Sequence, residues 1–131
     1  KYNVKIIHKI ENNILCDFID RSKIVLNIFN DESNKPFDYY RNIFLLCNNI
    51  LLISEYPSNI DLTIEPYFDD IKDNLLVPEY NNIIDCVENT LINYNNYSYI
   101  DNIIEKQTKF IEKIKLCPVY DLFFYNLILQ V

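Results

Sequence analysis

The chain contains no glycine anywhere in its 131 residues. Glycine adopts positive φ without strain and lets a backbone approach a phosphate closely. Glycine-rich nucleotide loops and the strained turns that present a catalytic serine are therefore excluded. Hairpin turns also lose their preferred residue, which disfavours antiparallel sheets.

Hydrophobic residues make up 50% of the chain. They recur at intervals of three and four residues, and prolines and Ser/Asn clusters divide the pattern into segments of helical length. Sustained alternation, the mark of a strand, is hard to find. The sequence therefore predicts an all-α, single-domain bundle of about seven helices over residues 1–131, with a central hydrophobic helix.

The expected helices are defined by their apolar stripes. Pro36, Pro66 and Pro78 mark helix starts, and Ser98 with Asp101 approximates a capping box. The two clearest stripes are Phe37, Tyr40, Phe44, Cys47 and Leu51, and Tyr80, Ile84, Val87, Leu91 and Tyr94. The others are Val4–Phe18, Val25–Phe29, Tyr67–Leu75, Ile100–Ile114 and the run Val119–Val131, which is apolar on nearly all sides.

The charge is acidic and unevenly placed. The net charge is -7, and between Glu55 and Glu105 eleven acidic residues face the single base Lys72. Phosphate binding needs clustered Lys and Arg, so nucleic acid is not expected as a partner. The acidic middle favours a basic partner. Without eighteen uncharged apolar residues in a row, no membrane span is expected within this chain.

Side chains that carry chemistry are few and poorly placed for it. His8 is the single histidine, which rules out a multi-histidine metal site. Cys16, Cys47, Cys86 and Cys117 form no CxxC pair, and each lies at a helical core spacing, so all four are predicted to be reduced small hydrophobes in a reducing compartment.

Two charged strings are predicted to be solvated surface. Asp69, Asp70 and Asp73 resemble the carboxylates that hold Mg²⁺ against a diphosphate, but no second acidic cluster accompanies them. Lys106, Lys109 and Lys113 share a helical face with glutamates. No catalytic residue, cofactor or metal site is predicted, and the chain is not expected to be an enzyme; an aspartate-based metal protein stays as a lesser hypothesis.

Tyrosine is frequent, with eleven in the chain. Some must be partly exposed, and exposed tyrosines are good interface anchors. The candidates are Tyr39, Tyr40, Tyr94, Tyr97, Tyr99 and Tyr125.

Three local strings carry a family resemblance. They are Ile7–Glu11 leading to Ile14-Leu15, then Ser33–Phe37, then Asn82–Val87 with Tyr94 and Asp101–Ile103 after it. In order and approximate spacing they resemble the poxvirus Bcl-2-like proteins, nearest to a member that blocks NF-κB activation by imitating the IκB degron. The resemblance implies a Bcl-2 fold and a function in binding. The degron's Ser-Gly element and the Asn-Trp-Gly-Arg string of cellular apoptosis regulators are both absent.

The resulting hypothesis is an intracellular viral virulence factor. It would bind a host protein in the host cell cytoplasm and inhibit innate immune signalling in the NF-κB pathway, and the acidic face and exposed tyrosines are the expected contacts. The alternative is an anti-apoptotic mimic that sequesters BH3 motifs. Homodimerisation stays open, and no individual partner-binding residue is assigned.

Overall fold

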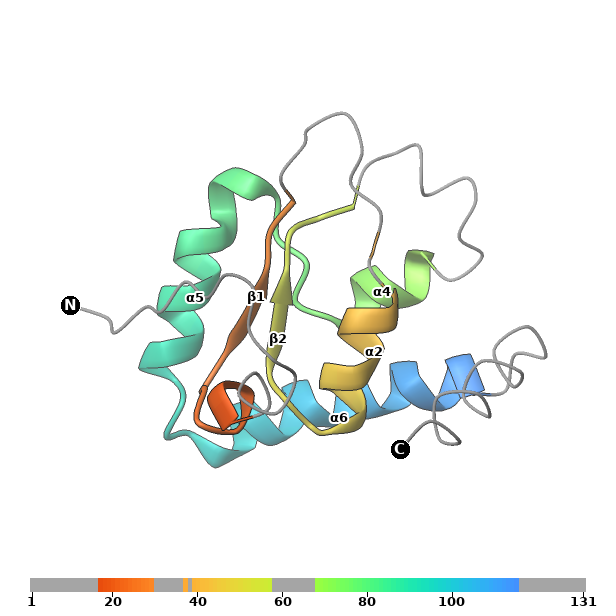
Figure 1. Ribbon diagram of the computed structural model, residues 1–131. Coiled ribbons are helices and arrows are strands. Elements are labelled where there is room, and N and C mark those ends of the chain that lie inside the picture. Colours follow the sequence, from red (N-terminus) through yellow and green to blue (C-terminus); the bar gives the residue numbers. More distant parts are fainter. Residues whose placement is uncertain (1–16, 30–36, 38, 58–67, 116–131) are drawn as a thin grey trace.

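The computed structural model describes residues 17–29, 37, 39–57 and 68–115, without the side chains of residues 39–41, 68–70 and 114–115. A helical turn at residues 17–20 comes first. The elements that follow are β1 (Val25–Asn27), α2 (Tyr39–Cys47), β2 (Leu52–Ser54), α4 (Phe68–Asn74), the 3-10 turn η1 (Tyr80–Asn82), α5 (Ile83–Ile92) and α6 (Tyr97–Lys115). Figure 1 shows the two strands side by side at the centre, with helices around them.

The expectation of an all-α, seven-helix Bcl-2-like bundle is wrong, because the described residues contain a parallel sheet. The stretch Val25–Phe29, predicted as a helix, contains β1, and the helix predicted to reach Leu51 ends at Cys47 and is followed by β2. Strands of a parallel sheet that is covered on both faces form continuous apolar runs without alternation. Such runs cannot be told from helical core segments by periodicity.

The parallel ladder extends to three segments. β1 and β2 pair in the register Val25↔Leu52, and an isolated parallel bridge joins Ile53 to Leu76. Beyond the bridge, the amide of Tyr56 donates to the carbonyl of Pro78 over 2.9 Å. Parallel neighbours need a crossover connection, and α2 lies between the first two segments and α4 between the second and third. The sheet order therefore follows the chain order.

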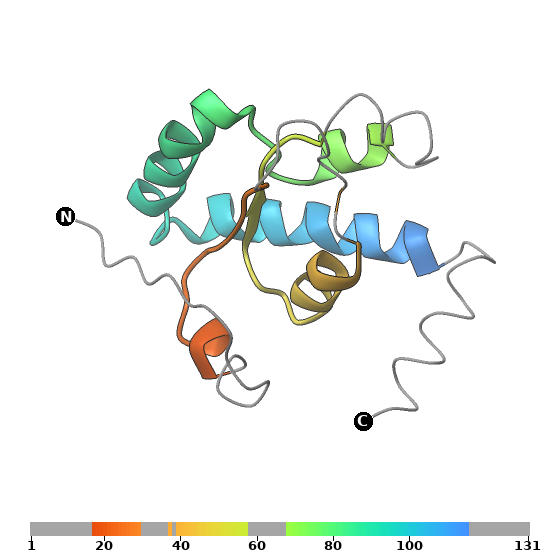
Figure 2. The ribbon, with the colours of Figure 1, turned by 45° about the horizontal axis from the view of Figure 1, so that its top comes forward.

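The two faces of this sheet are covered by different helices. Leu52 belongs to the main core, and Val25 and Val77 pack against it, so these alternate positions face α2, α4 and α6. Ile53 points to the other face, where it is also fully buried, and α5 packs against β2. In Figure 2, α5 lies apart from α2 and α4, with the strands between them.

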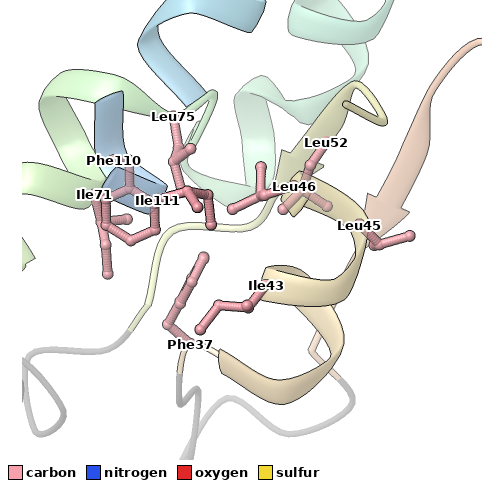
Figure 3. Close-up of a cluster of buried hydrophobic side chains, with 9 residues drawn as sticks. All are labelled: Phe37, Ile43, Leu45, Leu46, Leu52, Ile71, Leu75, Phe110 and Ile111. Carbon is pink, nitrogen blue, oxygen red and sulfur yellow. The ribbon is translucent and has the colours of Figure 1, made fainter. Parts of the chain in front are cut away.

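The main core fills the space between β2 and three helices. Figure 3 shows its side chains gathered from α2, β2, α4 and α6. Phe37 and Phe110 meet edge to face, with ring centroids 6.2 Å apart. The members are Phe37, Ile43, Leu45, Leu46, Leu52, Ile71, Leu75, Phe110 and Ile111.

The predicted stripe of α2 has the wrong register. Phe44 and Cys47 are exposed, and the buried positions of the helix are Asn42, Ile43, Leu45 and Leu46. The side of α2 that packs against β2 and α6 is therefore a different one from the predicted stripe. By contrast, Ile71 of α4 and Leu75, which follows the helix directly, are buried as predicted, and α4 begins at Phe68, shortly after Pro66.

Gln107 joins α6 to the start of β2. Its amide oxygen accepts from the backbone N–H of Leu52 over 3.3 Å, and its amide nitrogen donates to the carbonyl of Ile50 over 3.1 Å. The side chain is almost fully buried, so it replaces the water that these two backbone groups would otherwise bind.

We expect Gln107→Met to lower the free energy of unfolding by about 3 kcal/mol, because it keeps the side-chain volume and leaves a buried donor and a buried acceptor unpaired. Urea denaturation followed by circular dichroism measures this loss. The exposed Thr108→Ala on the same helix is the control and should change stability by less than about 0.5 kcal/mol. Equal midpoints for the two variants would contradict the role of Gln107.

Candidate functional site

The four most exposed large apolar side chains of the described residues lie on α5 or close to it in the sequence. Ile84 is 70% exposed and Ile92 is 77% exposed, although both are aliphatic. Tyr80 precedes the helix and Tyr97 follows it, and they are 62% and 83% exposed. This surface is the strongest candidate for a functional site.

Helical spacing places the two exposed isoleucines on one side of α5, together with two carboxylates. Ile84, Glu88 and Ile92 are four residues apart, so they lie along one side of α5, and Asp85 borders the same side. Asp85 and Glu88 are both exposed. We call these four residues, Ile84, Asp85, Glu88 and Ile92, the α5 face. The opposite side of the helix carries the buried Ile83 and Thr90 and packs toward the sheet.

Local signals fix the two ends of α5. Pro78 accepts a hydrogen bond from Tyr56 at the third strand segment, and the chain turns through η1 directly into the helix. At the other end, the Asn93 side chain donates to the carbonyl of Asn89 over 2.8 Å and ends the helix. This end agrees with the prediction that Ser/Asn clusters divide the helical segments.

The side of α5 that faces solvent was not predicted. The stripe Tyr80, Ile84, Val87, Leu91 and Tyr94 was expected to face the core, yet Tyr80 and Ile84 are among the most exposed residues. The helix is apolar on more than one side, and only its contact with β2 decides which side is buried. The signal that could have pointed to the α5 face is the surplus of isoleucine over what one buried side requires.

A hollow of about 410 Å³ lies below the start of α5. It is lined by Leu76 and its neighbours from the third strand segment, by Tyr56 after β2, by Lys72 of α4, and by Glu79 and Cys86. The strand segments end here, and carboxyl ends of parallel strands commonly border ligand sites. The charged residues that line the hollow, Lys72 and Glu79, are both exposed. Among the described contacts, none places a buried polar side chain inside the hollow.

The thiol in this hollow is a weak nucleophile. Burial raises the pKa of Cys86, and a hydrogen bond with the Thr90 side chain offsets part of that rise. The thiolate is the reactive form, so little of Cys86 is reactive at neutral pH. The hollow therefore has no activated nucleophile among its described side chains.

Glu55 belongs to the interior and not to the acidic surface. Its carboxylate is 2% exposed and accepts from the backbone N–H of Phe29 over 3.0 Å. Beside it, the Asn27 amide donates to the Ser54 hydroxyl over 3.0 Å. These contacts hold the ends of β1 and β2 together, so the expected acidic face begins after Glu55.

The remaining predicted residues are scattered. Cys47 is exposed, so the prediction that it lies in the core is wrong. Asp73 is exposed on α4, and the side chains of Asp69 and Asp70 lie outside the described residues. The described residues contain no group of three potential metal ligands. Also outside the description are His8, Cys16, Cys117, Tyr125, the side chains of Tyr39 and Tyr40, and the run Val119–Val131.

Lys109 of α6 and two of the candidate tyrosines, Tyr94 and Tyr99, make ordinary contacts. Lys109 pairs with Glu105 at 2.6 Å on an exposed face, and its hydrogen bond and charge lower the pKa of Glu105. Lys23 lies 4.6 Å from the ring centre of Tyr94, and Tyr99 accepts from Asn89. The Ser98 hydroxyl donates to the Asn96 side chain, and the backbone carbonyl of Asn96 accepts from Tyr99 and Ile100, so the predicted cap Ser98 lies inside α6.

Comparison with family models, with curated proteins and with solved structures finds no match to this chain. In the described part of the chain, no helix combines the length and the apolar content that crossing a membrane requires.

We expect Cys86 to react with iodoacetamide more slowly than Cys47 at neutral pH, because its thiol is half-buried and its pKa is raised. Peptide-resolved mass spectrometry measures both rates in one sample. The rate at Cys86 should rise steeply with pH. Since the folded pKa lies above the unfolded value, the folded state holds this proton more tightly, and that contribution to stability is lost as pH rises into the alkaline range. Equal rates at both cysteines would contradict the assignment.

Proposed function

We propose that the chain is a protein-binding module that contacts its partner through the α5 face. The observation that carries this proposal is the exposure of Ile84 and Ile92 on one side of a helix whose other side covers the sheet. Exposed apolar groups that cluster with polar neighbours are typical of interaction sites. Burying both isoleucines would contribute about 3 kcal/mol to binding before the cost of association.

Tyr80 and Tyr97 lie in the segments that precede and follow the helix. Each is mostly exposed, and a tyrosine supplies a large rigid contact area with a hydroxyl that hydrogen-bonds. The hollow beneath α5 supports catalysis less well, because its thiol is held in the unreactive form. A binding function accounts for more of the exposed residues than an enzymatic one.

The wider role is proposed on the family resemblance. In this proposal the partner is a host protein of innate immune signalling, bound in the host cell cytoplasm, and binding reduces NF-κB activation. The fold that the resemblance implied is wrong, so this role is supported by the short sequence strings alone. Capture of BH3 motifs would require the groove of a Bcl-2 fold, so this alternative does not form part of the proposal.

We expect the double variant Ile84→Ser, Ile92→Ser to lose at least about tenfold in partner affinity, because both anchors leave the contact. Its readout is a luciferase reporter for NF-κB in cells that express the full chain, stimulated with a cytokine. Wild type should lower the signal and the double variant should restore it. Phe44→Ser, which removes an exposed aromatic from α2, is the matched control and should act like wild type.

A photo-reactive amino acid at position 84 separates the binding surface from the signalling role. If the proposal holds, it forms a discrete cross-linked product in cells, and the same group at Thr108 on α6 does not. Cross-linking at position 84 without any effect on the reporter would retain the surface and remove the NF-κB role. No product at position 84, together with suppression of the reporter that survives the double variant, would reject the surface. If wild type also failed to lower the reporter signal, both the surface and the NF-κB role would be rejected.

A further inference from the structure

The charged side chains of the α5 face itself are both acidic, and the nearby bases are Lys72, at the hollow near the start of α5, and Lys23, beside Tyr94 after its end. Asp85 and Glu88 lie on the face itself, and Glu79 is exposed just before it. From residue 73 to residue 105 the sequence has six carboxylates and no lysine, arginine or histidine. A partner that covers the two isoleucines must therefore place its own charged groups beside carboxylates, and basic groups are favoured there.

The backbone of α5 has few N–H or C=O groups available for hydrogen bonds to a partner. Its N–H and C=O groups are used within the helix, and the Asn93 amide and side chain both bind the carbonyl of Asn89 at its end. An extended peptide needs an open sheet edge for its own backbone groups. A helix satisfies its backbone internally and binds through side chains alone, so a helix is the partner segment that suits this face.

The carboxylates of the α5 face also disfavour other kinds of partner. A second copy of the chain packed through the same face would bring Asp85 and Glu88 against their own counterparts, and like charges at an interface are unfavourable. Nucleic acid and anionic lipid would be repelled by the same carboxylates.

The edge of β1 is the main competing surface, with Leu26 and Ile28 partly exposed there. The charges next to it are mixed, since the exposed Asp20 lies beside the exposed Arg21 and Lys23. Nothing about this edge selects the chemistry of an occupant, so the α5 face is the better-defined site.

We infer that the α5 face binds a basic amphipathic helix of a partner protein. This inference rests on the proposed function and adds the chemical class of the partner. The apolar stripe of the partner helix covers Ile84 and Ile92, and its lysine or arginine side chains flank that stripe and lie beside Asp85 and Glu88. Because these ion pairs form at the rim, they mainly raise the association rate and make binding depend on salt.

Two designed peptides test the charge. Both have about 18 residues with leucines at helical spacing; one carries lysine at its polar positions and the other carries glutamate. Each is titrated into the isotope-labelled full chain by NMR. We expect the lysine peptide to bind at least about tenfold more tightly, with the largest amide shifts at residues 84–92, and to weaken as salt rises.

Charge-neutralising variants supply the matched control. Asp85→Asn with Glu88→Gln should weaken the lysine peptide about threefold or more and flatten its salt dependence, whereas Asp101→Asn with Glu112→Gln removes two exposed carboxylates elsewhere and should change little. Far-ultraviolet circular dichroism checks that both variants stay folded.

Three results of the peptide titration would overturn the inference: equal binding of the two peptides, amide shifts centred outside α5, or no binding of the lysine peptide. The inference would also fail if residues 1–16 or a second copy already covered the face in the free protein. Cross-linking from position 84 would detect such a cover. Cross-linking to a cellular partner with equal binding of both peptides would leave the proposed function intact and reject only the basic helix. Loss of the cellular cross-link would reject the proposed function itself.

Discussion

The parallel pairing of β1 with β2, and of β2 with the segment at Leu76, is the constraint on which the rest of the fold depends. Parallel neighbours cannot be joined by a tight turn, so each connection must cross the sheet and return, and helices α2 and α4 lie within those connections. The sheet then needs cover on both faces. Helices α2, α4 and α6 cover one face, and α5 packs on β2 from the other.

Polar side chains form hydrogen bonds with backbone N–H and C=O groups that the small sheet leaves without a strand partner. Gln107 supplies a donor and an acceptor where β2 begins, and Glu55 accepts the amide of Phe29 where β1 ends. Each of these groups is buried, so its hydrogen bonds replace water and fix the position of an element relative to the sheet. Asn42 is the exception, because both atoms of its buried amide have no partner among the described contacts. Helix α5 packs on this sheet and keeps its other side exposed.

The candidate site was predictable in part. The excess of acidic residues after Glu55 and the exposure of some tyrosines could be inferred from the sequence, and Glu88 and Tyr97 agree with that expectation. The two isoleucines of the α5 face could not be found, because an exposed isoleucine and a buried one look alike in a helix that is apolar on several sides. Glu55 shows the opposite error, since a carboxylate in an acidic stretch is normally exposed and this one is buried by strand pairing.

By itself the sequence placed the start of α4 near Pro66 and the division between α5 and α6, because proline and asparagine act on the backbone within a few residues. It placed the start of α5 at Pro78, whereas the 3-10 turn begins at Tyr80 and α5 at Ile83. It also determined the acidic charge and the absence of glycine-dependent sites. Only the tertiary structure decided that Val25–Asn27 and Leu52–Ser54 are strands, since each gains its hydrogen bonds from a segment more than twenty residues away. The same long-range contacts decided which sides of α2 and α5 are buried. An apolar side chain shows that a position can be buried, but the element that buries it is set by the tertiary structure.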